Sequence, residues 1–392
     1  MFYTIVKIWI RLGLSLFCRR ITFNDPCILK SKAPLLLACN HPNSFLDAII
    51  VGSHFNRPVH FLARGDVFRN PLAKKILTAL KMIPIYRLSE GREYLALNDA
   101  TFEKCGEILA GGGIVLIFAE GLCINQWVLR PLKKGAARIA WTAFANPGIQ
   151  NQFRVIPVGI NYNSFDKSGK RVIVNFENPI TISQFPALCA AADFIQQFNQ
   201  LLQASLQRAI LSGAYPENLI IQWLISNYSN GSANNINIIA DIKMRQQNAL
   251  NPPALTVSER LKSPGIITTD AMHVAWNVMV GIILWIPAWI GWLLHAPVYY
   301  PLRKLVLNKT RGTVFYDSAI FGGLLIVYPI YWMLMNTLSL LFLSSIVVQA
   351  VILLMPAFSW LYLIWKDCME RVRNYLLFPR RQRIALAEVL FH

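Results

Sequence analysis

Short apolar runs alternate with helical patterns from Leu35 to Ile180, and this alternation constrains the fold more than any other feature of the chain. The apolar runs predict strands buried on both faces, as in parallel sheets, at residues 35–38, 59–62, 82–86, 114–118, 155–162 and 172–176. Helices are expected between them at residues 71–81, 94–110 and 135–146. The alternation predicts an α/β domain, in which ligands gather where strands end and loops begin.

Four short segments place chemically active residues at those expected strand ends. They are Asn40–Asp47, Ile83–Arg87, Phe118–Gly121 and Val155–Gly159. Together they offer a general base with an orienting carboxylate, a cation and a tight backbone turn. This set of groups is suited to acyl transfer onto a hydroxyl, since the chemistry needs an activated oxygen nucleophile.

Taken as a set, the four segments resemble the glycerophospholipid acyltransferases, the family that makes lysophosphatidic and phosphatidic acid. The first has the family's His-to-Asp motif preceded by Asn, and the second ends in Arg after a hydrophobic strand. The third reads Phe-x-Glu-Gly and the fourth contains Pro-Val-Gly. All four occur in the family's order, and the resemblance covers less than half of the chain.

The resemblance implies a role for each motif residue. His41 is the base that removes the proton from the substrate hydroxyl, and Asp47 holds the other imidazole nitrogen. Arg87 binds phosphate oxygens, which guanidinium contacts in a bidentate manner. Gly121 lets the backbone approach the phosphate, and Glu120 orders the loop or bonds a substrate hydroxyl.

Further residues are expected to support this site. Lys133, with its neighbour Lys134, adds positive charge at a helix start or lies on a solvated basic face. Arg64 is a weaker candidate for the same phosphate. Asn40, Pro157 and Gly159 are supporting residues, the last two through backbone geometry alone.

Two departures from the family pattern matter. Five residues separate His41 from Asp47 instead of the usual four, a spacing found mainly in a bacterial and fungal branch. One extra residue would rotate Asp47 by about 100° in a continuous helix, but Pro42 favours a loop that keeps the contact with the imidazole. The third motif also lacks the hydroxyl residue that usually follows Glu-Gly, so that hydrogen bond is expected from Asn125 or from backbone.

The rest of the chain is expected to contact lipid, because 55% of all residues are hydrophobic and only 15% are charged. We expect an interfacial membrane-binding helix in residues 1–24 and the acyltransferase domain in residues 25–225. A polar, asparagine-rich linker or flap follows at residues 226–270. Transmembrane or re-entrant helices are predicted at residues 271–366, with a first apolar segment at 274–294 and two spans within 319–365. Residues 303–311 are expected to form a basic loop, and residues 367–392 a basic cytoplasmic tail.

The net charge of +18 points to anionic partners. Membrane lipid headgroups and phosphorylated substrates are simpler partners than nucleic acid, because no basic run accompanies a nucleic-acid fold. Part of the charge serves membrane topology in any case. The seven cysteines include no CxxC pair and fit reduced thiols in the cytoplasm, and Cys123 is expected to be a packing residue rather than a nucleophile. No metal site is expected, since His54 and His60 lie at no ligand spacing.

The sequence therefore predicts a membrane-bound acyltransferase with its catalytic domain on the cytoplasmic face. It would transfer a fatty acyl group from acyl-CoA or acyl carrier protein, without a cofactor, to a lysophospholipid or glycerol phosphate acceptor. We expect 1-acylglycerol 3-phosphate as the acceptor, with phosphatidic acid as the product. Glycerol 3-phosphate and another lysolipid are alternative acceptors, and a catalytically inactive lipid-binding scaffold is the alternative from another class.

Overall fold

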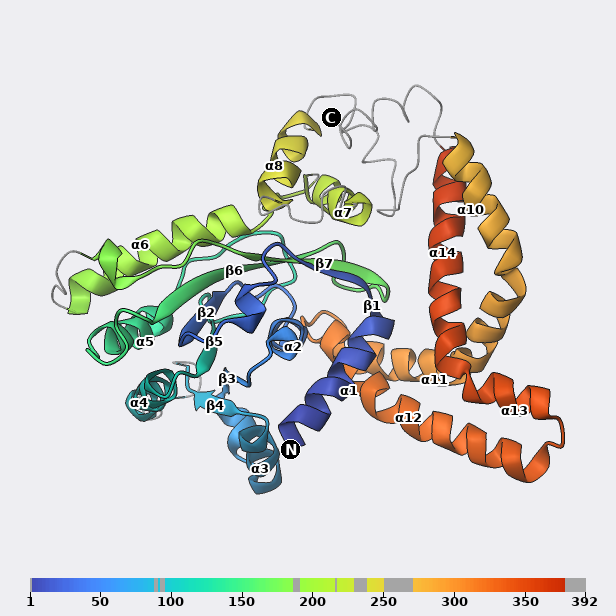
Figure 1. Ribbon diagram of the computed structural model, residues 1–392, viewed down its shortest axis with the longest axis horizontal. Helices are drawn as coiled ribbons and strands as arrows, with labels where there is room; N and C mark the ends of the chain where they lie inside the picture. Colours follow the sequence, from blue (N-terminus) through green and yellow to red (C-terminus); the bar gives the residue numbers. More distant parts are fainter. Residues whose placement is uncertain are drawn as a thin grey trace.

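A seven-stranded sheet forms the centre of the part of the chain that carries the four motifs, called the catalytic half below and comprising the described residues from 2 to 249 (Figure 1). The computed structural model describes residues 2–87, 91, 96–185, 191–215, 217–228, 238–249 and 271–377. The strands are β1 (Cys18–Phe23), β2 (Leu35–Cys39), β3 (Val59–Arg64), β4 (Met82–Ile85), β5 (Ile114–Phe118), β6 (Arg154–Tyr162) and β7 (Lys170–Phe176), in the order β1-β7-β6-β2-β5-β3-β4. Strands β2 to β6 are parallel to one another, while β7 is antiparallel to β6 and parallel to β1.

Six of these strands were expected, and β1 was not. Its sequence carries Arg19 and Arg20, which interrupt the apolar pattern. Strand β1 lies at the edge of the sheet beside β7, where charged side chains remain partly exposed. Charged residues are typical of edge strands, so the sequence signal for such a strand is weak.

Helices cover both faces of the sheet. Helices α1 (Phe2–Phe17) and α2 (Phe45–His54) pack on one face, and α4 (Leu97–Ala110), α5 (Gly135–Phe144) and α6 (Ala191–Ala209) pack on the other. Helix α3 (Pro71–Ala79) follows β3. Alternate residues of β2 point to opposite faces, so Leu35 and Leu37 join the first core while Leu36 and Ala38 join the second. The central strand is therefore buried on both sides, as its apolar sequence predicts.

The expected polar linker contains ordered helical structure. Helix α7 (Glu217–Asn227) ends within the first two residues of the expected linker, and α8 (Ile238–Ala249) lies inside the linker. Ile238, Ile239 and Ile242 are buried against α7. Residues 238–249 form a helix because three isoleucines give this asparagine-rich stretch one apolar helical face. Residues 229–237 and 250–270 of the expected linker lie outside the described residues.

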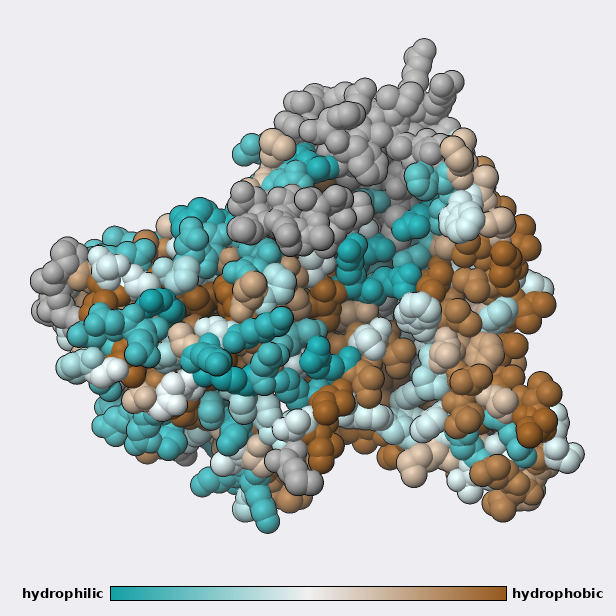
Figure 2. Space-filling view, viewed as in Figure 1, coloured by the Kyte–Doolittle hydropathy of each residue, from teal (hydrophilic) through white to brown (hydrophobic). Residues whose placement is uncertain are grey.

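The C-terminal part is helical and exposes apolar surface. It comprises α10 (Ala271–Ile283), α11 (Trp285–Thr310), α12 (Tyr316–Phe342), α13 (Ile346–Leu353) and α14 (Met355–Leu377). Figure 2 shows hydrophobic side chains over these helices and hydrophilic ones over most of the catalytic half. Helix α12 is long and apolar enough to cross a membrane, and two bent pairs would bring the total to three if each pair is one span.

Two helix pairs in this part are sharply bent, and the sequence analysis expected transmembrane or re-entrant helices here. Helices α10 and α11 meet at 58°, and α13 and α14 at 67°. The first apolar segment therefore breaks after Ile283, and α11 continues through most of the expected basic loop at 303–311. Helix α14 likewise continues to Leu377, so residues 367–377 are helical rather than a separate tail. Residues 378–392 of the expected tail lie outside the described residues.

Helix α1 fills most of the segment expected to bind the membrane interface. Its exposed apolar side chains are Phe2, Ile5, Ile8, Trp9 and Leu12. Leu14 and Phe17 are buried in the core instead. The helix is therefore present and has an apolar exposed face, although residues 18–23 of the segment form β1. Its insertion into the interface stays a prediction.

Candidate active site

A histidine–aspartate pair lies directly beyond the end of β2. His41 Nδ1 is 2.9 Å from Asp47 Oδ2, and the Asp47 side chain is fully buried. Asp47 also accepts hydrogen bonds from the Asn43 backbone N–H at 2.8 Å and from the Tyr162 hydroxyl at 2.7 Å. Asp47 accepts hydrogen bonds from these groups, so His41 Nδ1 carries a proton and donates it to Asp47. The other ring nitrogen, Nε2, then has a free lone pair and can act as a base.

The histidine ring is held flat against Phe118. The two ring centroids are 3.6 Å apart at an interplanar angle of 10°. The His41 side chain is 12% exposed, and Nε2 makes no hydrogen bond within the described part of the chain. The imidazole is thus oriented by Asp47 and Phe118 while its basic nitrogen remains available to a substrate hydroxyl.

The five-residue spacing is accommodated before and within the first turn of α2. Residues 40–44 form a loop, and Ser44 has a left-handed φ of +52° where the helix begins. Asp47 then lies in the first turn of α2. The contact between His41 and Asp47 is retained because the intervening residues are not one continuous helix, as Pro42 indicated.

Glu120 connects the loops that follow β2 and β5. One carboxylate oxygen accepts from the His41 backbone N–H at 2.8 Å, and the other accepts from the backbone and side chain of Arg130, each at 3.1 Å. Glu120 is 4% exposed. The glutamate therefore orders the loop, the first of the two roles considered for it, and its contact with substrate stays a prediction.

The turn after Glu120 requires glycine. Gly121 has φ +68°, and a Cβ added there would lie 2.9 Å from Lys133 Cγ. Lys133 itself is exposed, and its backbone N–H bonds the Ala119 carbonyl at 2.8 Å. Lys134 is the N-cap residue of α5. The geometry brings Lys133 beside the turn, as a phosphate-binding role would need.

The segment that lacks the usual hydroxyl residue holds residues 40–44, the catalytic loop between β2 and α2. Asn125 Nδ2 donates to the Pro42 carbonyl at 2.8 Å, and Cys123 Sγ accepts from the Ser44 N–H at 2.9 Å. Burial raises the pKa of the Cys123 thiol to about 12. Because so little thiolate is present at neutral pH, this cysteine fits a packing role better than a nucleophilic one.

Three supporting residues join β6 to its neighbours. Asn40 pairs with the backbone of Ile160, accepting from its N–H at 2.7 Å and donating to its carbonyl at 3.2 Å. Pro157 lies in β6 opposite Ala38 of β2. A Cβ at Gly159 would lie 2.1 Å from the carbonyl oxygen of Ala209, so glycine permits α6 to end against the sheet.

The candidate phosphate-binding arginine is near the outer part of the same sheet edge. Arg87 lies two residues beyond β4, which is separated from β2 by β5 and β3. Three interstrand spacings amount to about 14 Å, a gap that an arginine side chain and a glycerol phosphate can bridge together. Arg64 ends β3, nearer to β2, and pairs with Asp66 on the surface. The sheet order therefore brings His41 and Arg87 to one edge without direct contact.

A second network reaches the catalytic loop from α12. Asn43 Nδ2 donates to Asp317 Oδ2 at 2.8 Å, and Lys170 forms a buried ion pair with the same carboxylate. Ser318 Oγ accepts from the Leu46 N–H at 3.1 Å. Burial lowers the pKa of the Lys170 ammonium to about 7, although nearby acidic groups such as Asp166 and Asp47 oppose this shift.

Sequence reasoning missed most of these partners. Tyr162 was assigned only to a buried strand, and no role was given to Asn43, Arg130, Lys170 or Asp317. A long-range pair such as Lys170–Asp317, separated by 147 positions, leaves no local pattern. An acidic residue starting a long apolar helix is a signal that could have singled out Asp317, since such residues usually have a partner. Within the described residues, no group of three or more His, Cys, Asp or Glu side chains is placed to hold a metal ion.

Comparisons with known proteins find similarity to acyltransferases. Residues 20–161 match the family model described as Acyltransferase. A crystal structure of the 1-acyl-sn-glycerophosphate (LPA) acyltransferase PlsC from Thermotoga maritima is similar at 13% identity and a TM-score of 0.36, over 52% of this chain and 78% of that one. No curated protein matches the chain. The match to the acyltransferase family model over residues 20–161 supports the family expected from the four motifs.

Proposed function

We propose that the protein is a membrane-bound acyltransferase that acylates the free hydroxyl of 1-acylglycerol 3-phosphate from an acyl thioester and so forms phosphatidic acid. The observation that carries the proposal is the His41–Asp47–Tyr162 chain of hydrogen bonds, with Nε2 of the histidine left for a substrate. A lipid-binding scaffold would have no need of a base oriented in this way. The apolar helices after residue 271 favour an acceptor that is itself resident in a membrane.

The reaction follows from the roles of the two polar groups. His41 Nε2 takes the proton of the acceptor hydroxyl while that oxygen attacks the thioester carbonyl carbon. Asp47 stabilises the imidazolium that forms. The carbon–sulfur bond then breaks, and the departing thiolate of coenzyme A or acyl carrier protein receives the proton from His41. No cofactor enters these steps.

The phosphate of the acceptor would be held at the outer part of the sheet edge. A phosphate monoester carries about two negative charges at neutral pH, and Arg87 would neutralise part of that charge. Lys133 and the backbone at Gly121 would contribute from the loop after β5. A catalytic domain on the cytoplasmic face would have access to soluble acyl donors.

The test compares acceptors that differ only in phosphate or acyl chain. Purified protein would receive palmitoyl-CoA or palmitoyl-acyl carrier protein with 1-acylglycerol 3-phosphate, 1-acylglycerol or glycerol 3-phosphate, and the lipid product would be identified by mass spectrometry. We expect 1-acylglycerol 3-phosphate to have the highest kcat/KM. Arg87→Gln should raise its KM about 10- to 100-fold, the loss of a charge-assisted contact, while the rate with 1-acylglycerol is unchanged.

Lys74→Gln is the matched control, since this cation is exposed on α3 and belongs to none of the four motif segments. Preference for glycerol 3-phosphate would replace the acceptor in the proposal. Equal use of 1-acylglycerol, or an unchanged KM in Arg87→Gln, would refute phosphate recognition at this edge.

A further inference from the structure

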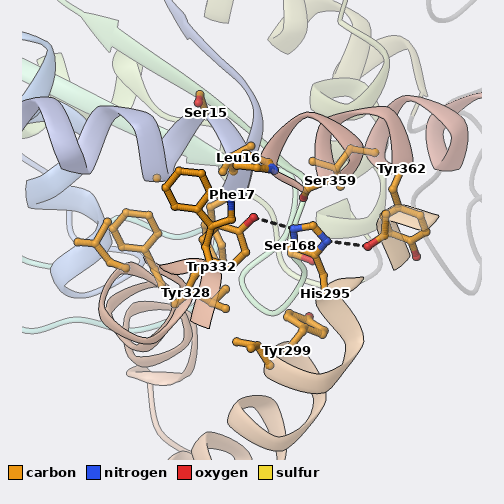
Figure 3. Close-up of a pocket in the computed structure, with 18 of the residues that line it drawn as sticks. Ser15, Leu16, Phe17, Ser168, His295, Tyr299, Tyr328, Trp332, Ser359 and Tyr362 are labelled. Atoms are coloured by element: carbon orange, nitrogen blue, oxygen red, sulfur yellow. Dashed lines mark hydrogen bonds between the residues drawn. The ribbon is translucent and has the colours of Figure 1, made fainter. Parts of the chain in front are cut away.

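A cavity of about 600 Å³ lies between α1 and the C-terminal helices α11, α12 and α14 (Figure 3). Its volume falls within the range typical of ligand sites in proteins. Aromatic and aliphatic side chains form most of its wall, among them Leu12, Phe17, Val298, Leu324 and Trp332. All four helices lie outside residues 20–161, the range that matches the acyltransferase family model.

Several polar atoms in the wall are already bonded within the protein. His295 Nδ1 bonds the Gly291 carbonyl at 2.6 Å, and its Nε2 bonds the Tyr328 hydroxyl at 2.9 Å. Trp9 Nε1 donates to the Leu325 carbonyl at 3.1 Å. Water molecules need two to four polar partners each, so a wall of this kind favours a hydrocarbon occupant.

The cavity has the length of one acyl chain. Residues 291–303 of α11 contribute to its wall over about 18 Å, and residues 321–332 of α12 over about 16 Å, at 1.5 Å per residue. The two helices are antiparallel, because Arg303 bonds Tyr316 while His295 bonds Tyr328. One leaflet of a bilayer has a hydrocarbon depth of about 15 Å, half of the core thickness.

Two cations line this cavity, Arg303 of α11 and Lys366 of α14, and Arg303 belongs to a larger basic cluster. Arg303 begins the basic stretch Arg303–Arg311, which holds four cations and no acidic residue. Arg303, Lys304, Lys309 and Arg311 are exposed, and none forms an ion pair within the described residues. Such a cluster attracts acidic lipid headgroups, by about 1 kcal/mol for each cation at the surface.

The cavity is separated from the catalytic histidine by buried polar side chains. Phe321 lines the cavity one helical turn after Asp317, which bonds Lys170 and the catalytic loop. Lys170, Asp317 and Tyr162 are all at most 2% exposed. This packed layer gives a chain in the cavity no direct path to His41.

We propose that the cavity binds one acyl chain of an acidic bilayer phospholipid, with the phosphate at Arg303. The bound lipid is distinct from the lipid that reacts at His41. By filling the space between α1 and α12, it would support the helix that carries Asp317 and Ser318 to the catalytic loop. The binding does not depend on the acyltransferase proposal and would persist in a His41→Gln protein.

The experiment is native mass spectrometry of the delipidated full-length protein with phosphatidylglycerol or phosphatidylcholine of identical chains. We expect one phosphatidylglycerol per protein, bound about fivefold more tightly than phosphatidylcholine. Ala296→Phe and Leu324→Trp fill the cavity from two different helices and should each weaken binding at least tenfold. Leu293→Phe is the matched control, because this residue is 63% exposed on α11 and is not part of the wall.

The headgroup is tested separately. Arg303→Gln should remove most of the preference for phosphatidylglycerol, whereas Lys309→Gln, six residues further along α11, should keep it. The thermal unfolding temperature of each variant, followed through its buried thiols, identifies any protein that has not folded. Absence of a bound lipid in the wild type, unchanged binding in a folded cavity-filled variant, or equal binding of both lipids would each overturn the proposal.

Discussion

Breaking the Lys170–Asp317 pair should destabilise the catalytic half and impair catalysis together. The side chains are 0% and 2% exposed, so removal of either partner leaves an uncompensated buried charge. Such a change costs about 3–5 kcal/mol. For a domain of this size, 3 kcal/mol corresponds to a fall in the unfolding temperature of about 6–12 °C.

The pair is best measured by a double-mutant cycle. Asp317→Asn and Lys170→Met should each show the full loss of stability. The double variant buries no charge, so its loss should be smaller than the sum of the two single losses by about 2 kcal/mol or more. Unfolding would be followed by a thiol-reactive dye, because Cys18, Cys39 and Cys105 are buried in the folded protein. Asp317→Asn should also lower the transfer rate, since Asp317 is the acceptor for Asn43 in the catalytic loop.

Arg19→Met is the control for this cycle. Arg19 pairs with Asp367 between β1 and α14, but both side chains are about one-fifth exposed and Asp367 keeps Arg171 as a second partner. A partly exposed pair of this kind is worth about 0–1 kcal/mol. Additive losses in the Lys170 and Asp317 variants, or an Asp317→Asn protein as stable as the wild type, would refute the reasoning.

Three further predictions concern single side chains. Tyr162→Phe removes a donor to the buried Asp47 carboxylate and should cost about 1.5–3 kcal/mol of stability in the same dye assay, so an unchanged unfolding temperature would contradict the role given to its hydroxyl. Gly159→Ala forces a Cβ against the Ala209 carbonyl and should lower the free energy of unfolding by about 1–3 kcal/mol. An unfolding temperature equal to that of the wild type would mean that the end of α6 moves to accommodate the Cβ at no cost. Because the pKa of the Cys123 thiol is raised to about 12, the thiol should resist alkylation by iodoacetamide in the folded protein at pH 8. The Cys123→Ser variant should also retain transfer activity. Rapid alkylation or complete loss of activity would favour a nucleophilic cysteine.

The fold of the catalytic half was largely predictable because its physical signals are local. Five-residue apolar runs such as that of β2, buried on both faces, identify parallel strands without knowledge of their neighbours. Strand β1 was missed because edge strands carry charges, and α8 because three isoleucines are inconspicuous in an asparagine-rich stretch. The bends between the C-terminal helices depend on packing between helices, which hydropathy alone does not encode.

The site was predictable to the extent that it follows a motif. His41 and Asp47 were identified from their resemblance to the family's His-to-Asp motif, despite the extra residue between them. Pro42 indicated that this residue would be accommodated in a loop before the helix. The contacts that hold this pair come from Tyr162, over 100 positions away, and from Asp317 beyond the catalytic half. Such partners are set by tertiary packing, so a single sequence offers little evidence for them.

Acceptor-dependent thiol release by wild-type and His41→Gln protein tests the central claim most directly. His273→Gln is the control, since His273 is exposed on α10. The account predicts that the wild type and His273→Gln release thiol only when an acceptor is present, and that His41→Gln is slower by about 10³-fold or more, the effect of losing a positioned base. Equal rates in His41→Gln and the wild type would contradict the assignment of His41 as the base.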